Sequence, residues 1–315
     1  MKDILYIVIP CYNEEKVLPI THKMFLDELN ELIKKEKISA DSKIVFVDDG
    51  SRDETWKIIC DLSEQHGSIE GIQQSRNRGH QNAVLMGMLD SRDKCDICIT
   101  IDCDGQDDIT AIEQMVDKYH EGYEVVYGVR DNRDTDTLFK KYTAQGFYTL
   151  LKKMGVDVVY NHADYRLMSK SALDGLSQFK EVNLFLRGLF PEMGQKTDYV
   201  YFEVKPRKYG KSKYTLWKLF SLAMQGITSY SIVPLRLVSF TGMIMSLGAF
   251  ILGLSVIVEK YTSRYVLPGW ATIVAAVSFI GGIQIFCLGI IGEYIGQLFQ
   301  EVKARPRYIL EEELN

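Results

Sequence analysis

The first 128 residues alternate between short apolar runs and longer segments with apolar residues at helical spacing. The apolar runs predict strands at 4–9, 43–47, 69–73, 97–101 and 124–127. The helical spacing predicts helices between them, at about 14–37, 53–66, 80–93 and 109–121. A chain in which strands and helices alternate favours a mostly parallel sheet with helices on both faces. The expected fold class of this region is therefore α/β.

Two long stretches near the C-terminus carry no charged side chain, at about 237–258 and 270–292. About 20 consecutive apolar residues cross a bilayer as a helix, so both stretches are expected to be transmembrane helices. A buried helix pair in a globular core is the alternative. Lysine and arginine gather outside the two stretches, at 205–213 and 303–307. By the positive-inside rule, we expect a multi-pass protein of the cell membrane with its N-terminal domain and both termini in the cytoplasm.

These patterns divide the chain into consecutive parts. They are an α/β domain (1–213), a juxtamembrane amphipathic helix (214–231), two transmembrane helices (232–298) and a cytoplasmic tail (299–315). The segments 139–154 and 214–230 both have apolar residues on one helical face. Such segments fit either ordinary surface helices or helices that lie on a bilayer.

An acidic loop follows the fourth predicted strand and contains Asp102, Asp104 and Gln106. Two carboxylates at this spacing on a loop can approach one cation, whereas on a regular strand or helix they would diverge. Oxygen ligands suit Mg²⁺ or Mn²⁺, which often bind one or two carboxylates together with substrate phosphates. The alternative is a solvated acidic turn. The neighbouring strand ends favour the metal site.

The ends of the first three strands are also rich in polar side chains. They read Pro10-Cys-Tyr12-Asn-Glu14, Asp48-Asp49-Gly-Ser-Arg, and Ser75-Arg-Asn-Arg-Gly-His80-Gln-Asn. Helix caps and turn residues would explain some of these positions. Because ligands bind at the carboxyl edge of an open α/β sheet, we expect a common site there.

Composition narrows the partners further. The net charge of −5 makes nucleic acid an unexpected partner. The six cysteines are scattered, which favours packing positions in a reducing cytosol.

Three of these stretches together resemble a known family. They are Val8-Ile-Pro-Cys-Tyr-Asn-Glu14, Val47-Asp-Asp-Gly-Ser-Arg-Asp53 and Ile101-Asp-Cys-Asp-Gly-Gln-Asp107. They are similar to the nucleotide-sugar motifs of family 2 glycosyltransferases of GT-A fold. The C-terminal stretches 289–296 and 301–306 are similar to the polyprenyl-phosphate branch, which includes bactoprenol-phosphate glucosyltransferases and dolichol-phosphate mannose synthases. The resemblance covers nearly the whole chain.

The resemblance implies a role for each candidate residue. Asp102, Asp104 and Gln106 would hold Mg²⁺ or Mn²⁺ and the donor diphosphate. The nucleotide sugar would be bound by Pro10, Tyr12, Glu14, Asp49 and Asp102. Asp164 matches the proposed catalytic base, and the lipid phosphate would meet Arg130, Arg133, Arg207, Lys211, Ser212 and Lys213. The run at 205–213 could instead only adhere to anionic lipid or set topology.

The acceptor chemistry limits what a base at Asp164 can do. A phosphate monoester is largely a dianion at pH 7, so little proton remains to be removed. We therefore expect Asp164 to act partly by orienting a cation or Arg166 near the acceptor. The alternative is a structural ion pair with Arg166 that fixes a loop.

The expected function is inverting transfer of a hexose from a nucleotide diphosphate sugar, UDP-glucose or a related UDP-sugar, to undecaprenyl phosphate. It would occur at the cytoplasmic membrane face, and a separate flippase and a downstream glycosyltransferase would use the product in cell-envelope glycosylation. A homo-oligomer is possible. The alternatives are another lipid or polysaccharide acceptor, or a non-catalytic membrane scaffold. A processive synthase would carry a Gln-x-x-Arg-Trp motif, which the sequence lacks.

Overall fold

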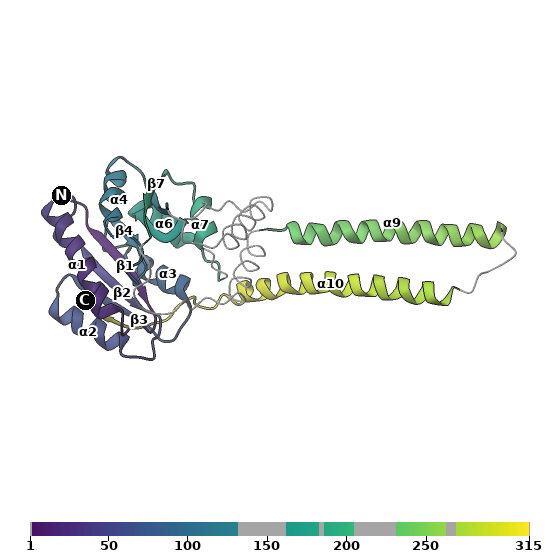
Figure 1. The fold of residues 1–315 in the computed structure, drawn as a ribbon, viewed down its shortest axis with the longest axis horizontal. Coiled ribbons are helices and arrows are strands. Elements are labelled where there is room, and N and C mark those ends of the chain that lie inside the picture. Colours follow the sequence, from purple (N-terminus) through teal and green to yellow (C-terminus); the bar gives the residue numbers. More distant parts are fainter. Residues whose placement is uncertain (1, 132–161, 183–185, 205–230, 263–268, 315) are drawn as a thin grey trace.

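The computed structural model describes residues 2–131, 162–182, 186–204, 231–262 and 269–314 (Figure 1). The amphipathic segments predicted at 139–154 and 214–230 lie outside these residues. The described chain consists of a sheet-containing domain and two long helices that project from one end of it (Figure 1).

A mixed sheet forms the centre of the domain, and within the described residues it has eight strands in the order β7-β5-β6-β4-β1-β2-β3-β8. The strands are β1 (Leu5–Cys11), β2 (Lys43–Asp48), β3 (Ile69–Gln74), β4 (Ile97–Thr100), β5 (Val125–Arg130), β6 (His162–Ser169), β7 (Thr197–Phe202) and β8 (Leu310–Leu314). The central strands β4, β1, β2 and β3 are parallel, as predicted. β6 runs antiparallel between β4 and β5, and β8 is antiparallel to β3. The five predicted strands are all present.

Helices cover both faces of this sheet. The helices are α1 (Leu18–Lys34), α2 (Thr55–Gln65), α3 (His80–Ser91), α4 (Ala111–His120), α6 (Lys170–Gln178) and α7 (Leu186–Glu192). Successive residues of a strand point to opposite faces, so Ile7 packs in a core with α1, α2 and α4 while Val8 packs in a second core with α3, α6 and α7. All seven residues of β1 are buried, which is typical of a strand with helices on both sides.

Helix α1 begins at Leu18, four residues after its predicted start. The intervening residues belong to a loop whose backbone N–H groups bond to side chains of the neighbouring loop, from Asn13 to Ser51 Oγ and from Glu14 to Thr55 Oγ1. Pro19 stands in the first turn of the helix, where its missing N–H costs nothing. The polar residues at the end of β1 are thus held at the sheet edge by the loop after β2.

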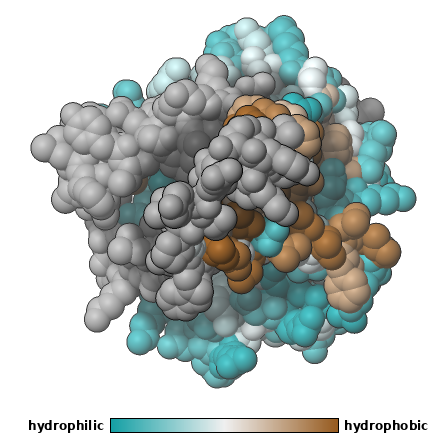
Figure 2. Space-filling view, turned by 90° about the vertical axis from the view of Figure 1, so that its right-hand side faces the viewer, coloured by the Kyte–Doolittle hydropathy of each residue, from teal (hydrophilic) through white to brown (hydrophobic). Residues whose placement is uncertain are grey.

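The two C-terminal helices, α9 (Val233–Thr262) and α10 (Trp270–Lys303), lie side by side as an antiparallel hairpin (Figure 1). Among the described residues, one stretch is long and apolar enough to cross a membrane, Phe279–Lys303, and none of it is buried. Val233–Gly248 is a shorter apolar stretch of α9. Figure 2, which looks at the hairpin end of the molecule, shows hydrophobic side chains there against a mostly hydrophilic domain surface. Exposed apolar surface of this extent indicates an apolar environment.

The chain after α10 returns to the sheet. α10 extends past the predicted helix end at 292 and finishes at Lys303, followed by Ala304 with φ +45°. The rest of the predicted tail then supplies β8, which pairs with β3 from Gly71↔Leu314 to Gln74↔Leu310. Both ends of the hairpin therefore lie at the domain.

Candidate active site

The loops after β1 and β2 are interlocked at the carboxyl edge of the sheet. The Asp49 N–H donates to the carbonyl oxygen of Cys11 at 2.8 Å, and the Arg52 N–H donates to Asn13 Oδ1 at 2.9 Å. Asn13 has φ +53°, a conformation that asparagine tolerates better than most residues. Pro10 is buried in β1, and Tyr12 and Glu14 are half-buried in the following loop. These three predicted nucleotide-sugar residues therefore lie together at the carboxyl end of β1.

Asp49, the fourth predicted nucleotide-sugar residue, holds the loop between β3 and α3. Its carboxylate accepts hydrogen bonds from Asn77 Nδ2 at 2.9 Å, from the Arg78 N–H at 2.8 Å and from the Gly79 N–H at 3.0 Å. Burial raises its pKa, and the two backbone N–H groups oppose that rise. Asp49 is only 2% exposed. In this conformation it fixes the start of α3, and its contact with a nucleoside stays a prediction.

The pairing of β4 with β6 brings two acidic residues together from distant parts of the chain. The antiparallel register pairs Thr100 with Arg166, so its continuation by two residues sets Asp102 opposite Asp164. His80, the first residue of α3, lies beside both: its Nε2 is 3.7 Å from Asp102 Oδ1 and 3.5 Å from Asp164 Oδ2. Partial burial disfavours the charged imidazole, but Asp164 and Asp102 raise the pKa of His80 to about 9.

Asp164 is surrounded by cations. Arg187 of α7 binds it with two parallel hydrogen bonds, from Nε to Oδ1 and from Nη2 to Oδ2, each 3.1 Å long. Arg166 Nη2 also donates to Oδ1 at 3.1 Å. Burial alone would raise the pKa of Asp164, but Arg187, His80 and Arg166 together hold it well below its usual value. A carboxylate in this state stays ionised at neutral pH.

Arg166 and Arg187 occupy different environments around that carboxylate. The Arg166 side chain is 1% exposed and its guanidinium lies over the Phe190 ring, 4.1 Å from the centroid. Burial lowers the pKa of Arg166 to about 10, so it remains charged at neutral pH. The Arg187 side chain is 39% exposed. One arginine is thus a buried partner, and the other is accessible at the sheet edge.

The acidic loop after β4 contains all three candidate metal ligands, and its buried Asp107 pairs with an arginine of β5. Asp104 Oδ1 accepts the Gln106 N–H at 3.1 Å, which curves the loop back on itself. Asp107 is buried and accepts Arg130 Nη2 at 3.0 Å. Burial raises the pKa of Asp107 to about 7, against the lowering effect of Arg130. Arg130, a predicted acceptor-phosphate residue, therefore pairs with this loop from the end of β5.

The other predicted acceptor-phosphate residues are Arg133, Arg207, Lys211, Ser212 and Lys213, and all lie outside the described residues. Within the part of the chain that the structure describes, no group of three or more His, Cys, Asp or Glu side chains could hold a metal ion. Burial, and then the nearby charges of Asp164 and Asp104, raise the pKa of Asp102. A divalent cation would relieve that crowding, and two carboxylates completed by substrate phosphates suit Mg²⁺ or Mn²⁺. Oxygen donors of this kind suit the predicted cation, and the metal site itself stays a prediction.

Two residues of this arrangement were not among the predicted site residues. His80 stands in the polar stretch after the third strand. The sequence therefore predicted its position at the carboxyl edge of the sheet but gave it no function. Arg187 lies in α7, and no local motif marks it. It reaches Asp164 because α7 packs in one hydrophobic core with β6, and the Leu186 N–H is bonded to Gln81 Oε1 of α3 at 2.9 Å.

Two family models match this chain. Residues 6–176 match the Glycosyl transferase family 2 domain, and residues 233–298 match the GtrB C-terminal hairpin. The chain belongs to glycosyl transferase family 2 and is a glycosyltransferase. The resemblance to the polyprenyl-phosphate branch is confirmed, because the hairpin match and relatives named as bactoprenol glucosyl transferases both support it.

This chain is similar to two relatives and to one solved structure. The uncharacterized glycosyltransferase YkoT of Bacillus subtilis is 44% identical, over 99% of this chain and 93% of its own. The bactoprenol glucosyl transferase of Shigella phage SfX is 34% identical, over 96% of this chain and 97% of its own. The mannosyltransferase PcManGT from Pyrobaculum calidifontis, in complex with GDP-Man and Mn²⁺, aligns with a TM-score of 0.45 and 14% identity, over 97% of this chain and 89% of its own.

Proposed function

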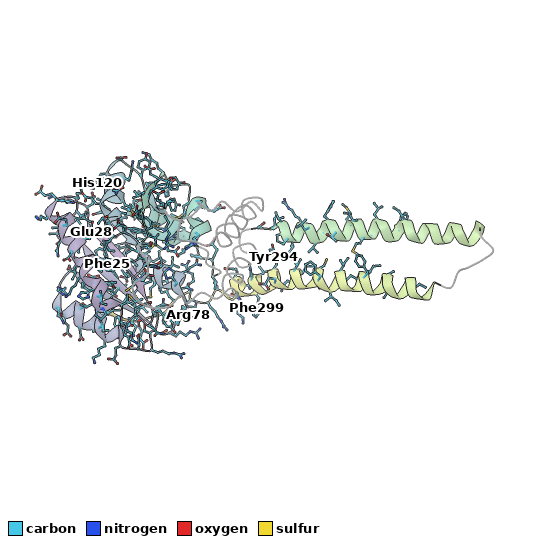
Figure 3. All side chains as sticks on the ribbon, in the orientation of Figure 1. Phe25, Glu28, Arg78, His120, Tyr294 and Phe299 are labelled. Carbon is cyan, nitrogen blue, oxygen red and sulfur yellow. The ribbon has the colours of Figure 1, made fainter. Side chains whose placement is uncertain are left out.

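We propose that this glycosyltransferase transfers a hexose from a nucleotide diphosphate sugar to undecaprenyl phosphate, with UDP-glucose or a related UDP-sugar as donor. The observation that carries the proposal is the meeting of Asp102 and Asp164 at the edge of the sheet that faces the hairpin. Figure 3 places Arg78, which follows β3, on the hairpin side of the domain and His120, at the opposite edge, on the far side. A site at this edge suits a water-soluble donor and a membrane-bound acceptor.

The donor would be bound by the loops after β1, β2 and β4. Asp102, Asp104 and Gln106 would hold Mg²⁺ or Mn²⁺, which neutralises the negative charge that grows on a leaving diphosphate. Pro10, Tyr12 and Glu14 would line the nucleoside. The interlocked loops support this assignment, since they fix the nucleoside end of the site relative to the acidic loop.

The acceptor phosphate would attack C1 of the sugar directly, which inverts an α-linked donor to a β-linked product. Its second pKa is near 6, so at neutral pH it needs little help from a base. The ionised state of Asp164 favours a different role, in which it holds Arg187 where a phosphate could meet it. Arg130, Arg133 and the basic run 205–213 would supply further positive charge near the membrane surface.

The membrane arrangement is part of the proposal. Helices α9 and α10 would cross the bilayer as a pair, with the domain and both termini in the cytoplasm. The pairing of β8 with β3 supports an even number of crossings, because the chain returns to the domain after the hairpin. The product would then need a separate flippase to reach the outer face, where a downstream glycosyltransferase would use it. The homo-oligomer remains a prediction.

A transfer assay tests this function. Full-length protein in vesicles that contain undecaprenyl phosphate is incubated with UDP-glucose, UDP-galactose, UDP-N-acetylglucosamine or GDP-mannose, and the lipid products are identified by mass spectrometry. We expect one UDP-sugar to yield a polyprenyl-phosphate hexose with a β-linkage by NMR. Asp102→Asn serves as the inactive control. A protein that glycosylates diacylglycerol or a polysaccharide but not undecaprenyl phosphate would refute the proposed acceptor.

A further inference from the structure

The last turn of α10 and the chain that follows it are hydrogen-bonded to the segment between α6 and α7. Glu301 accepts the Val182 N–H with both carboxylate oxygens, at 3.0 and 2.9 Å. Arg307 Nη1 donates to the carbonyl oxygen of Phe179 at 2.9 Å. Glu301 and its neighbours form the C-terminal stretch that marks the bactoprenol subgroup, yet neither residue has a part in the proposed transfer. Their contacts are to backbone atoms far away in the sequence.

The segment that these residues hold leads directly into the active site. A few residues beyond Val182, the Leu186 N–H is bonded to Gln81 Oε1, and the next residue, Arg187, binds Asp164 with two hydrogen bonds. Gln81 follows His80, which lies 3.5 Å from Asp164. The described residues from 179 to 187 are therefore tied to the tail at one end and to the site at the other.

The tail itself is fixed on both sides of Glu301. Glu301 itself belongs to the last turn of α10, and after it β8 is paired with β3. Side chains of β8 reinforce the pairing: Glu313 accepts Lys94 Nζ at 2.7 Å, and Glu312 accepts Trp56 Nε1 at 3.1 Å. A charged acceptor on a fixed element makes a strong and directional hydrogen bond. Glu301 can therefore fix the position of the 179–182 backbone relative to α10.

We propose that Glu301, assisted by Arg307, is a positioning residue: it anchors the segment that carries Arg187 and so couples the membrane hairpin to the acceptor side of the active site. This inference rests on the proposed function, in which Arg187 meets the lipid phosphate. Transfer reactions lose rate steeply when a reacting group is misplaced by about 1 Å. An unanchored segment would let Arg187 leave its two-point contact with Asp164.

A set of tail variants tests the coupling in vesicles with undecaprenyl phosphate. Glu301→Ala is expected to lower kcat by about tenfold, the loss of one hydrogen bond to a charged group, with the donor KM unchanged. Glu301→Gln retains one acceptor oxygen and should recover part of the rate. The control is Glu313→Gln, which weakens the salt bridge of another tail carboxylate, to Lys94 and away from this segment, and should transfer at the wild-type rate. Equal rates for Glu301→Ala and Glu313→Gln would overturn the proposal.

A double variant separates positioning from a general structural effect. If Glu301 acts through Arg187, then Glu301→Ala added to Arg187→Ala should lower kcat less than twofold further. A full tenfold loss in the Arg187→Ala background would show that Glu301 acts elsewhere and would overturn the proposal.

Hydrogen exchange tests the anchor without any substrate. In the full-length protein, amide exchange over 179–187 should be faster in Glu301→Ala than in the wild type and unchanged in Glu313→Gln, measured by mass spectrometry. Exchange unaltered by Glu301→Ala would refute the anchor whatever the enzyme transfers. Wild-type protein that fails to glycosylate undecaprenyl phosphate would refute the proposed function instead, and the exchange result would still decide the anchoring.

Discussion

Replacement of Asp164 by asparagine should expose how much of the site depends on one negative charge. The variant keeps the size of the side chain but leaves Arg166, whose side chain is 1% exposed, without a compensating carboxylate. Breaking a buried ion pair on one side typically costs about 3–5 kcal/mol. Because the Asp164 side chain is 23% exposed, water can partly replace it. We expect a loss of about 2–3 kcal/mol in the free energy of unfolding, just below that range.

The thermal unfolding midpoint in detergent measures this loss. About 2–3 kcal/mol corresponds to a fall of roughly 5–10 °C for a domain of this size. Asp174→Asn is the matched control, because Asp174 also faces an arginine, Arg92, at 3.6 Å but its side chain is 52% exposed. A surface pair of that kind contributes about 0–1 kcal/mol, so the midpoint should hardly move. Equal midpoints for the two variants would refute the assignment of Asp164 as the partner of a buried charge.

The pH dependence of the difference tests the ionisation of Asp164. Its folded pKa is depressed below the ordinary value of 3.8, so its stabilising effect is fully present above pH 3.8 and is lost as the pH falls through the folded pKa. The difference in midpoint between the wild type and Asp164→Asn should therefore be constant from about pH 6.5 down to about pH 5. Above pH 6.5 it should shrink, because His80, whose pKa Asp164 helps to raise to about 9, then loses its proton in the folded state. A difference that fades between pH 7 and 5 would mean that Asp164 takes up a proton there, as a general base would.

Further predictions concern the acidic loop, the loop contact of Asp49 and the basic run. Asp104→Asn should abolish transfer, and EDTA should do so reversibly, with Mg²⁺ or Mn²⁺ restoring it; full activity in excess chelator would exclude the metal. Gly50→Ala should lower the unfolding midpoint, because a Cβ there would lie 2.5 Å from the Arg76 carbonyl carbon at a φ of +62°, with a cost of at least about 1–2 kcal/mol. Neutralising Lys211 and Lys213 should raise the acceptor KM and leave nucleotide binding intact; an unchanged KM with altered membrane orientation would show that the run only sets topology.

The parts of the fold that the sequence predicted well are those where pattern and burial coincide. β1, β2 and β4 are apolar runs in the middle of the sheet, and burial on both faces leaves a clear signal. β8 gave no such signal, because its sequence is Leu-Glu-Glu-Glu-Leu. It is a strand because the edge of β3 offers it hydrogen bonds, and tertiary context of this kind overrides local propensity.

The candidate site shows the same division. Asp102 and Asp104 were predicted as a pair from their spacing on one short loop after a strand, together with the polar ends of the neighbouring strands. The partners of Asp164 could not be found in this way: His80 and Arg187 are each many residues away, and only the β4–β6 register and the packing of α7 bring them together. The pairing of Asp164 with Arg166 was anticipated and is present in the structure. The hydrogen bonds to Asp49 from the Asn77 side chain and from the backbone N–H groups of Arg78 and Gly79 were not anticipated, because they depend on how closely two loops approach.

The surroundings of Asp164 bear on which chemistry suits this site. A general base contributes about 10²–10⁴-fold where a proton must leave in the transition state, and its best pKa is near the working pH. Two guanidinium groups hold Asp164 far from that condition. An alcohol acceptor would need a base and would find a poor one here, whereas a phosphate dianion brings its own nucleophilic oxygen. Arg166 and Arg187 lower the pKa of Asp164 and so make it a weak base. The same two arginines would provide positive charge beside a bound phosphate dianion. From the charges of this site we therefore infer a phosphate acceptor, independently of the names of the relatives.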